Sequence, residues 1–127
     1  MGYQVRGEPQ FIRIRFFGKV TRSELLAALD EMEVLEASAA TMPHRLTDLT
    51  DVELSEVKAV DIHAAAEKRS RRRFANRFRS AVVAPQPVQF GYARMFQVLN
   101  QHPDISIQIF ADIATATAWL ASESVMR

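Results

Sequence analysis

The alternation of apolar and polar positions predicts five β-strands. The clearest period-two pattern covers 105–110, and 11–17 follows the same pattern with arginines between its apolar residues. A weaker alternation over 3–8, followed by a turn, predicts a hairpin with the second strand. The segment 44–50, in which Leu46 and Leu49 fall out of strict alternation, indicates a buried strand or a bulge, and 78–84 (FRSAVVA) indicates another strand. These segments supply enough strands for one sheet.

Four helices are predicted between and after these strands. Their expected extents are about 21–40, 55–69, 87–101 and from 112 onward. Thr21 and Glu24 fit a capping box at the first helix. Ser55 is placed to cap the second helix, and Asp112 the fourth. Pro87 suits the first turn of the third helix, because proline there loses no helical hydrogen bond.

The order of these elements predicts the fold class. Two strands are followed by alternating helices and strands, and a helix between two strands usually leaves them parallel. We therefore expect an α/β fold with a mostly parallel five-stranded sheet, an antiparallel first strand and four helices. No internal repeat or linker interrupts the pattern, so residues 1–127 are interpreted as a single domain.

The composition narrows the class of protein. The 127 residues are enough for one hydrophobic core, and the absence of cysteine excludes disulfides and thiolate metal sites. Charged residues interrupt every apolar stretch of the first twenty positions, so no signal peptide or membrane helix is predicted there. These features indicate a cytoplasmic protein.

The net charge of +1 conceals two charged blocks that adjoin in the sequence. Eleven of the fifteen acidic residues lie between positions 24 and 67, and seven basic residues follow between 68 and 79. The blocks either form a dipolar surface or neutralise each other. Arg71, Arg72 and Arg73 are the candidates for contact with a polyanion, for which we expect weak and non-specific binding at most. A solvated basic surface partly paired with the acidic helices is the favoured interpretation.

Several short strings give the chain a family resemblance. The element order, together with 18–20 (GKV), 90–96 (FGYARMF), 109–112 (IFAD) and 118–120 (AWL), resembles the SpoIIAA-like family, part of the wider STAS and SEC14-like grouping. The resemblance covers nearly the whole chain. It implies a small STAS-like domain with helices around a five-stranded sheet, commonly without enzymatic activity. These motifs identify a fold more than a function.

The chain departs from sporulation regulators of the STAS type in the segment before the second helix. Those proteins carry a phosphorylatable serine in an Asp-Ser-Ser-Gly-like loop, whereas Ser55 stands here among acidic residues without a following glycine. Like charges would oppose a phosphate there, so helix capping is favoured over a switch. Asp48 and Asp51 could hold a cation or a polar ligand after the third strand. Ordinary acidic loop residues before a helix explain them better.

The third helix carries more large apolar side chains than one inward stripe can hold. Tyr92, Met95 and Phe96 therefore form a candidate interface for a homodimer or a protein partner. Core packing and a pocket for an apolar small molecule are the alternatives.

No catalytic, cofactor-binding or metal-binding residues are predicted. The four glycines do not cluster into a phosphate-binding loop, and His44, His63 and His102 are far apart in the sequence. The favoured function is a non-enzymatic regulatory or protein-interaction module without a cofactor. A carrier or sensor of a lipid-like or other apolar small molecule is the alternative, and an enzyme using Asp48 and Asp51 is the third hypothesis.

Overall fold

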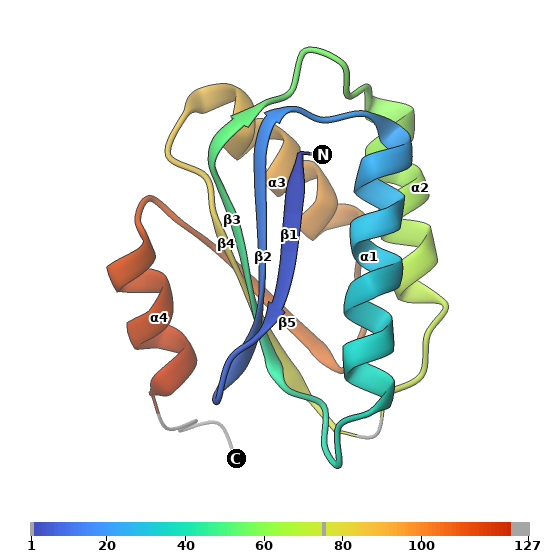
Figure 1. Ribbon diagram of the computed structural model, residues 1–127, viewed down its shortest axis with the longest axis vertical. Helices are drawn as coiled ribbons and strands as arrows, with labels where there is room; N and C mark the ends of the chain where they lie inside the picture. Colours follow the sequence, from blue (N-terminus) through green and yellow to red (C-terminus); the bar gives the residue numbers. More distant parts are fainter. Residues whose placement is uncertain (1, 75, 123–127) are drawn as a thin grey trace.

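The computed structural model describes residues 2–74 and 76–122 and shows a five-stranded sheet with helices on both faces (Figure 1). The strands are β1 (Tyr3–Gly7), β2 (Phe11–Lys19), β3 (His44–Glu53), β4 (Phe78–Val83) and β5 (Ile105–Phe110). The helices are α1 (Arg22–Ala37), α2 (Ala59–Ser70), α3 (Pro87–Leu99) and α4 (Ile113–Ala121). The expected order of strands and helices is confirmed.

The strands lie in the sheet in the order in which they occur along the chain. β1 is antiparallel to β2, whereas β2 with β3, β3 with β4 and β4 with β5 are parallel pairs. Each parallel pair needs a crossover connection, which α1, α2 and α3 supply in turn. The predicted mostly parallel sheet with an antiparallel first strand is therefore confirmed.

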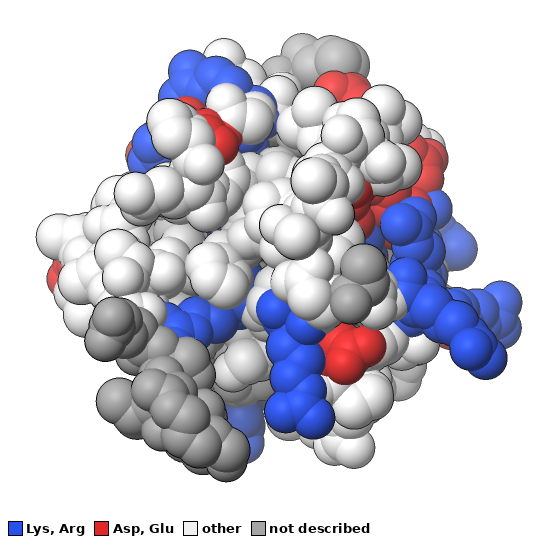
Figure 2. Space-filling model, turned by 90° about the horizontal axis from the view of Figure 1, so that it is seen from below, with Lys and Arg blue, Asp and Glu red and all other residues white. Residues whose placement is uncertain are grey.

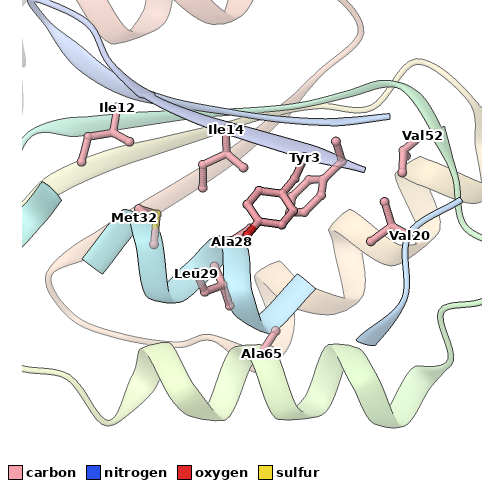
Figure 3. Close-up of a cluster of buried hydrophobic side chains, with 10 residues drawn as sticks. Tyr3, Ile12, Ile14, Val20, Ala28, Leu29, Met32, Val52 and Ala65 are labelled. Carbon is pink, nitrogen blue, oxygen red and sulfur yellow. The ribbon is translucent and has the colours of Figure 1, made fainter. Parts of the chain in front are cut away.

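The larger part of the core lies between the sheet and α1. Tyr3 of β1 and Ile12 and Ile14 of β2 point from the strands toward this helix (Figure 3). They meet Ala28 and Met32, whose side chains are completely buried. Alternation places these strand residues on one face, so the same pattern that defines β2 also builds this core.

The opposite face of the sheet is covered by α4 (Figure 1). Leu46 of β3 packs with Ala81 and Val83 of β4, and Ala116 and Leu120 of α4 close over them. β4 thus carries buried side chains on both faces, and β3 buries Leu46 on the α4 side.

Local start signals for three of the helices are confirmed. The Thr21 hydroxyl accepts the Glu24 N–H at 3.2 Å, and the Glu24 carboxylate accepts the Thr21 N–H at 3.0 Å. Asp112 accepts the Thr115 N–H at 2.8 Å, and Pro87 is the first residue of α3. None of the four helices in the described part of the chain is long and apolar enough to cross a membrane.

The start of α2 was predicted wrongly. The Ser55 hydroxyl donates to the Glu53 carboxylate at 2.8 Å and does not cap the helix. α2 begins at Ala59, and the Asp61 carboxylate accepts the Lys58 N–H at 2.9 Å. An acid inside the first turn therefore stabilises the helix N-terminus in place of the serine.

The strand with the clearest alternation lies at the edge of the sheet. β5 pairs with β4 on one side, and no other described strand lies beside it. Ile107 and Ile109 are partly buried, while Ser106 and Gln108 are exposed. On the free side of β5, the Gln97 side chain of α3 donates to the Ile107 carbonyl at 2.7 Å. This contact occupies one of the backbone groups that an edge strand leaves open.

We expect the cost of truncating an isoleucine to follow its place in the sheet. Ile14 is 1 % exposed in β2, so Ile14→Ala should lower the free energy of unfolding by about 2–5 kcal/mol. Ile109→Ala, in the partly buried edge strand, should cost less than half as much. Urea unfolding of both variants measures the difference. Equal losses would contradict the edge position of β5.

Candidate functional site

A buried arginine joins α2 to α1. Arg69 lies in the last turn of α2, and its side chain has no exposed surface. Its guanidinium donates to the two carboxylate oxygens of Glu36 at 2.9 and 2.8 Å, and to Glu33 at 3.0 Å. Two-pronged pairing of this kind is the strongest contact between arginine and a carboxylate. The pair therefore fixes how the two helices lie against each other.

A second arginine is buried beside this pair, and its positive charge is less completely compensated. Arg45 of β3 is 4 % exposed, and its Nη2 lies 3.6 Å from a Glu36 oxygen that already accepts from Arg69. The Phe78 ring centre lies 5.2 Å from its guanidinium carbon. Its Nε and Nη2 make no hydrogen bond to the described residues. Burial, and then the neighbouring Arg69 charge, lower the pKa of Arg45 to about 9, so it stays protonated at neutral pH.

The ion pairs continue toward the surface around Glu33. The Glu33 carboxylate also forms ion pairs with Arg72 at 3.1 Å and with Lys68 at 3.5 Å. Lys68 forms a further ion pair with Asp30 at 2.5 Å. The acidic residues belong to α1, whereas the basic residues lie at the end of α2 and just beyond it. The two charged blocks of the sequence therefore neutralise each other, at least in part, where these elements meet.

The three candidate polyanion residues have different surroundings. Arg71 is exposed and pairs with Glu67 at 3.1 Å, Arg72 pairs with Glu33, and Arg73 is exposed. Figure 2 shows basic side chains in separate groups with uncharged surface between them. No continuous basic face is visible from this side, and weak polyanion binding stays a prediction.

The face of the sheet beneath α1, α2 and α3 also borders an apolar cavity. The cavity has a volume of about 100 Å³. Ile14 and Val82 line it from the strands, and Leu29, Ala65 and Ala93 line it from the three helices. All five side chains are buried. Core side chains of the sheet and of the three helices therefore form part of the cavity wall.

Tyr92 and Phe96 line this cavity, and Met95 between them is partly buried. The Tyr92 hydroxyl donates to the Val57 carbonyl at 2.8 Å and so ties α3 to the loop before α2. Both aromatic side chains are thus engaged inside the protein. These positions agree with core packing and with a pocket, two interpretations that the sequence leaves open, and the interface stays a prediction.

Other side chains form the exposed apolar part of α3. Val88, Phe90 and Val98 are 63 %, 50 % and 46 % exposed. Arg94 lies on the same outer side and donates to Gln97 at 2.6 Å. The excess of large apolar groups on this helix is therefore divided between the cavity and the surface.

Polar groups gather at one end of the cavity. Arg45 and Ser80 are opposite each other on β3 and β4, and Thr47 follows two residues later on the same face of β3. Leu54 and Val57 line the cavity from the loop beyond the other end of β3. The cavity thus runs along the sheet from a cationic, hydroxyl-bearing end to an apolar end beneath a loop.

The acidic residues predicted to form a ligand or switch loop with Ser55 lie in a strand. β3 continues past both aspartates because β2 pairs beside it with a register shift. Asp48 accepts the N–H and hydroxyl of Thr50 at 2.9 and 2.6 Å, and Asp51 pairs with Arg15 at 2.9 Å. No group of three or more His, Cys, Asp or Glu side chains within residues 2–74 and 76–122 is arranged to hold a metal ion.

The buried ionic residues were missed at the level of sequence, although each carried a signal. Glu36 extends the apolar stripe of α1 that includes Leu29 and Met32, and Arg69 extends the stripe of α2. Arg45 stands next to the fully buried Leu46 near the start of β3, on the opposite face of the strand. A charge in line with a buried stripe indicates a buried ion pair, because an unpaired charge there would be too costly.

Removing the Glu36 carboxylate, which Arg69 and Arg45 share, should destabilise the protein. Glu36→Gln leaves Arg69 and Arg45 buried with too little negative charge, so we expect a loss of about 3–5 kcal/mol in the free energy of unfolding. The matched control is Glu67→Gln, which breaks an exposed pair and should cost less than about 1 kcal/mol. Similar losses for the two variants in chemical denaturation would contradict a structural role for the buried pair.

Comparison with known proteins gives a structural relative. No family model matches the sequence, and no curated protein matches it. Among solved structures, the chain is similar to an uncharacterised protein of the DUF3478 family with a SpoIIAA-like fold from Shewanella loihica PV-4. The two share 19 % sequence identity and a TM-score of 0.62, over 94 % of this chain and 92 % of the other. The chain therefore has a SpoIIAA-like fold, as its element order and short motifs indicated.

Proposed function

We propose that the protein is a non-enzymatic regulatory module of the SpoIIAA-like type that binds a small apolar molecule in the cavity beneath α1, α2 and α3. The observation that carries this proposal is the inward placement of Tyr92 and Phe96 around an apolar cavity of about 100 Å³. Apolar cavities of roughly this size, about 150 Å³ in an engineered example, take up molecules such as benzene.

The lining of the cavity suits binding better than chemistry. It is apolar except near Arg45, Thr47 and Ser80, and no histidine or carboxylate is among the described side chains that line it. A hydroxyl needs a neighbouring base to become a nucleophile. A predominantly apolar site with a few polar groups instead favours the orientation of a ligand.

The loop before α2 offers a route from the cavity to the surface. Val57 is buried against the cavity, whereas Ser55 and Glu56 in the same loop are exposed. The Tyr92 hydrogen bond holds Val57 in place. A ligand that presses on Val57 or Tyr92 would shift this loop, which gives the module a surface that a partner can distinguish.

Toluene is a suitable first probe of the cavity. We expect it to raise the melting temperature of the wild type and to shift the methyl NMR signals of Val57, Ala65 and Val82. Ala93→Leu fills part of the cavity and should abolish both effects. Ala118→Leu adds the same group to the exposed side of α4 and should leave them intact.

Two results would count against an apolar ligand. One is a wild type that shows no change with toluene up to its solubility limit. The other is equal binding by wild type and Ala93→Leu, which would place the probe outside the cavity. Native mass spectrometry of protein purified from cells then tests whether an apolar molecule is retained.

A second candidate function is self-association through α3. Val88, Phe90 and Val98 are exposed on this helix, which packs beside the edge strand β5. In a two-fold dimer the same patch could meet its own copy and bury these side chains. Tyr92, Met95 and Phe96 would then support the patch from within.

Analytical ultracentrifugation over a concentration series tests this second function. We expect the wild type to show a dimer at high concentration and Phe90→Glu to remain monomeric, because a charge would be buried in the interface. Val34→Glu, on the exposed side of α1, is the matched control and should behave as the wild type. A wild type that is monomeric at every concentration would exclude the dimer.

A further inference from the structure

We infer that the cavity selects a small apolar monocarboxylate, whose carboxylate lies against Arg45 and the hydroxyls of Thr47 and Ser80. The inference rests on the proposed function, because it assigns the head group of the ligand that the cavity would hold. Its basis is the position of an incompletely paired, buried arginine in the lining of an otherwise apolar cavity.

Glu36 supplies Arg45 with too little negative charge. Glu36 already gives both of its oxygens to Arg69, at 2.9 and 2.8 Å. Arg45 is left with a contact of 3.6 Å to Glu36 and two nitrogens without a hydrogen bond to the described residues. Buried guanidinium groups normally use their N–H groups fully, because leaving them unpaired is costly. A carboxylate from outside would supply the missing acceptors.

Two other groups near Arg45 do not supply a free carboxylate. Glu33, one helical turn before Glu36 on α1, accepts from Arg69, Lys68 and Arg72 at 3.0–3.5 Å. It is therefore shared among three cations already. The Phe78 ring faces the Arg45 guanidinium at 5.2 Å and offers attraction but no hydrogen-bond acceptor oxygen. Neither group replaces a carboxylate.

The lining of the cavity indicates the size and shape of the ligand. Thr47 and Ser80 lie at the Arg45 end of the cavity and provide hydroxyl donors for a second oxygen. The remaining walls are apolar side chains such as Leu29, Val82 and Phe96. A volume of about 100 Å³ matches a short branched or cyclic hydrocarbon. The best match is a small branched-chain or aromatic acid.

Isovalerate and isovaleramide form a matched pair of probes, because they have the same shape and only the first is charged at neutral pH. We expect the wild type to bind isovalerate at least tenfold more tightly, with shifts of the Ala65 and Ala93 methyl signals. Arg45→Met should remove this preference and leave the affinities for isovaleramide and toluene within about twofold of the wild type. Arg71→Gln, in the exposed basic segment, should keep the preference.

The outcomes separate the two proposals. If toluene binds but the wild type does not distinguish the acid from the amide, the carboxylate proposal is wrong and the apolar cavity stands. If no probe binds, both proposals fail. A preference for isovalerate that survives Arg45→Met, or that disappears in Arg71→Gln, would place the anion elsewhere. The wild-type comparison decides the matter even if Arg45→Met does not fold.

Discussion

The interior of this protein depends on the compensation of two buried arginines. Arg69 is enclosed between α2 and α1 and takes both oxygens of Glu36. Arg45 approaches the same carboxylate from the sheet at 3.6 Å. One acid thus connects two helices and a strand, and any shift of these elements would leave charge buried without a partner. Such a network contributes more to fixing one arrangement than to net stability, because desolvation offsets much of its attraction.

The cavity results from small side chains on the facing surfaces of the sheet and the helices beside this network. Ala65 and Ala93 face the sheet from α2 and α3, and Ser80 faces them from β4. Small side chains on opposing surfaces cannot fill the space between a sheet and its helices. Arg45 lies at one end of that space and is also 3.6 Å from the Glu36 carboxylate of the ion-pair network. The same geometry therefore creates an apolar cavity and gives it a cationic end.

The SpoIIAA-like fold accounts for the arrangement of strands and helices, whereas the activity depends on the side chains of the site. At 19 % identity, the likeness to the Shewanella protein concerns the arrangement of strands and helices. Unrelated functions can share one fold, so the function depends on the side chains of the site. Among them, Tyr92 connects the cavity to Val57 in the loop before α2. In the proposed function, this contact would transmit the effect of a bound ligand to the surface loop.

The sequence by itself determined the features that depend on neighbours in the chain. Alternation and helical spacing gave the five strands and four helices, and Thr21, Pro87 and Asp112 marked helix starts correctly. These signals act within one helical turn or along one strand, so they can be recognised before the fold is known. The parallel arrangement followed from the helices between successive strands.

Only the tertiary structure decided which long-range partners meet. Local pattern did not fix three features of the structure. These are the capping of α2 by Asp61 in place of Ser55, the edge position of β5 and the inward placement of Tyr92. The pairing of Glu36 with Arg69 joins residues 33 positions apart. Each of these outcomes depends on packing between distant segments, because burial and charge compensation are properties of the assembled interior rather than of any one element.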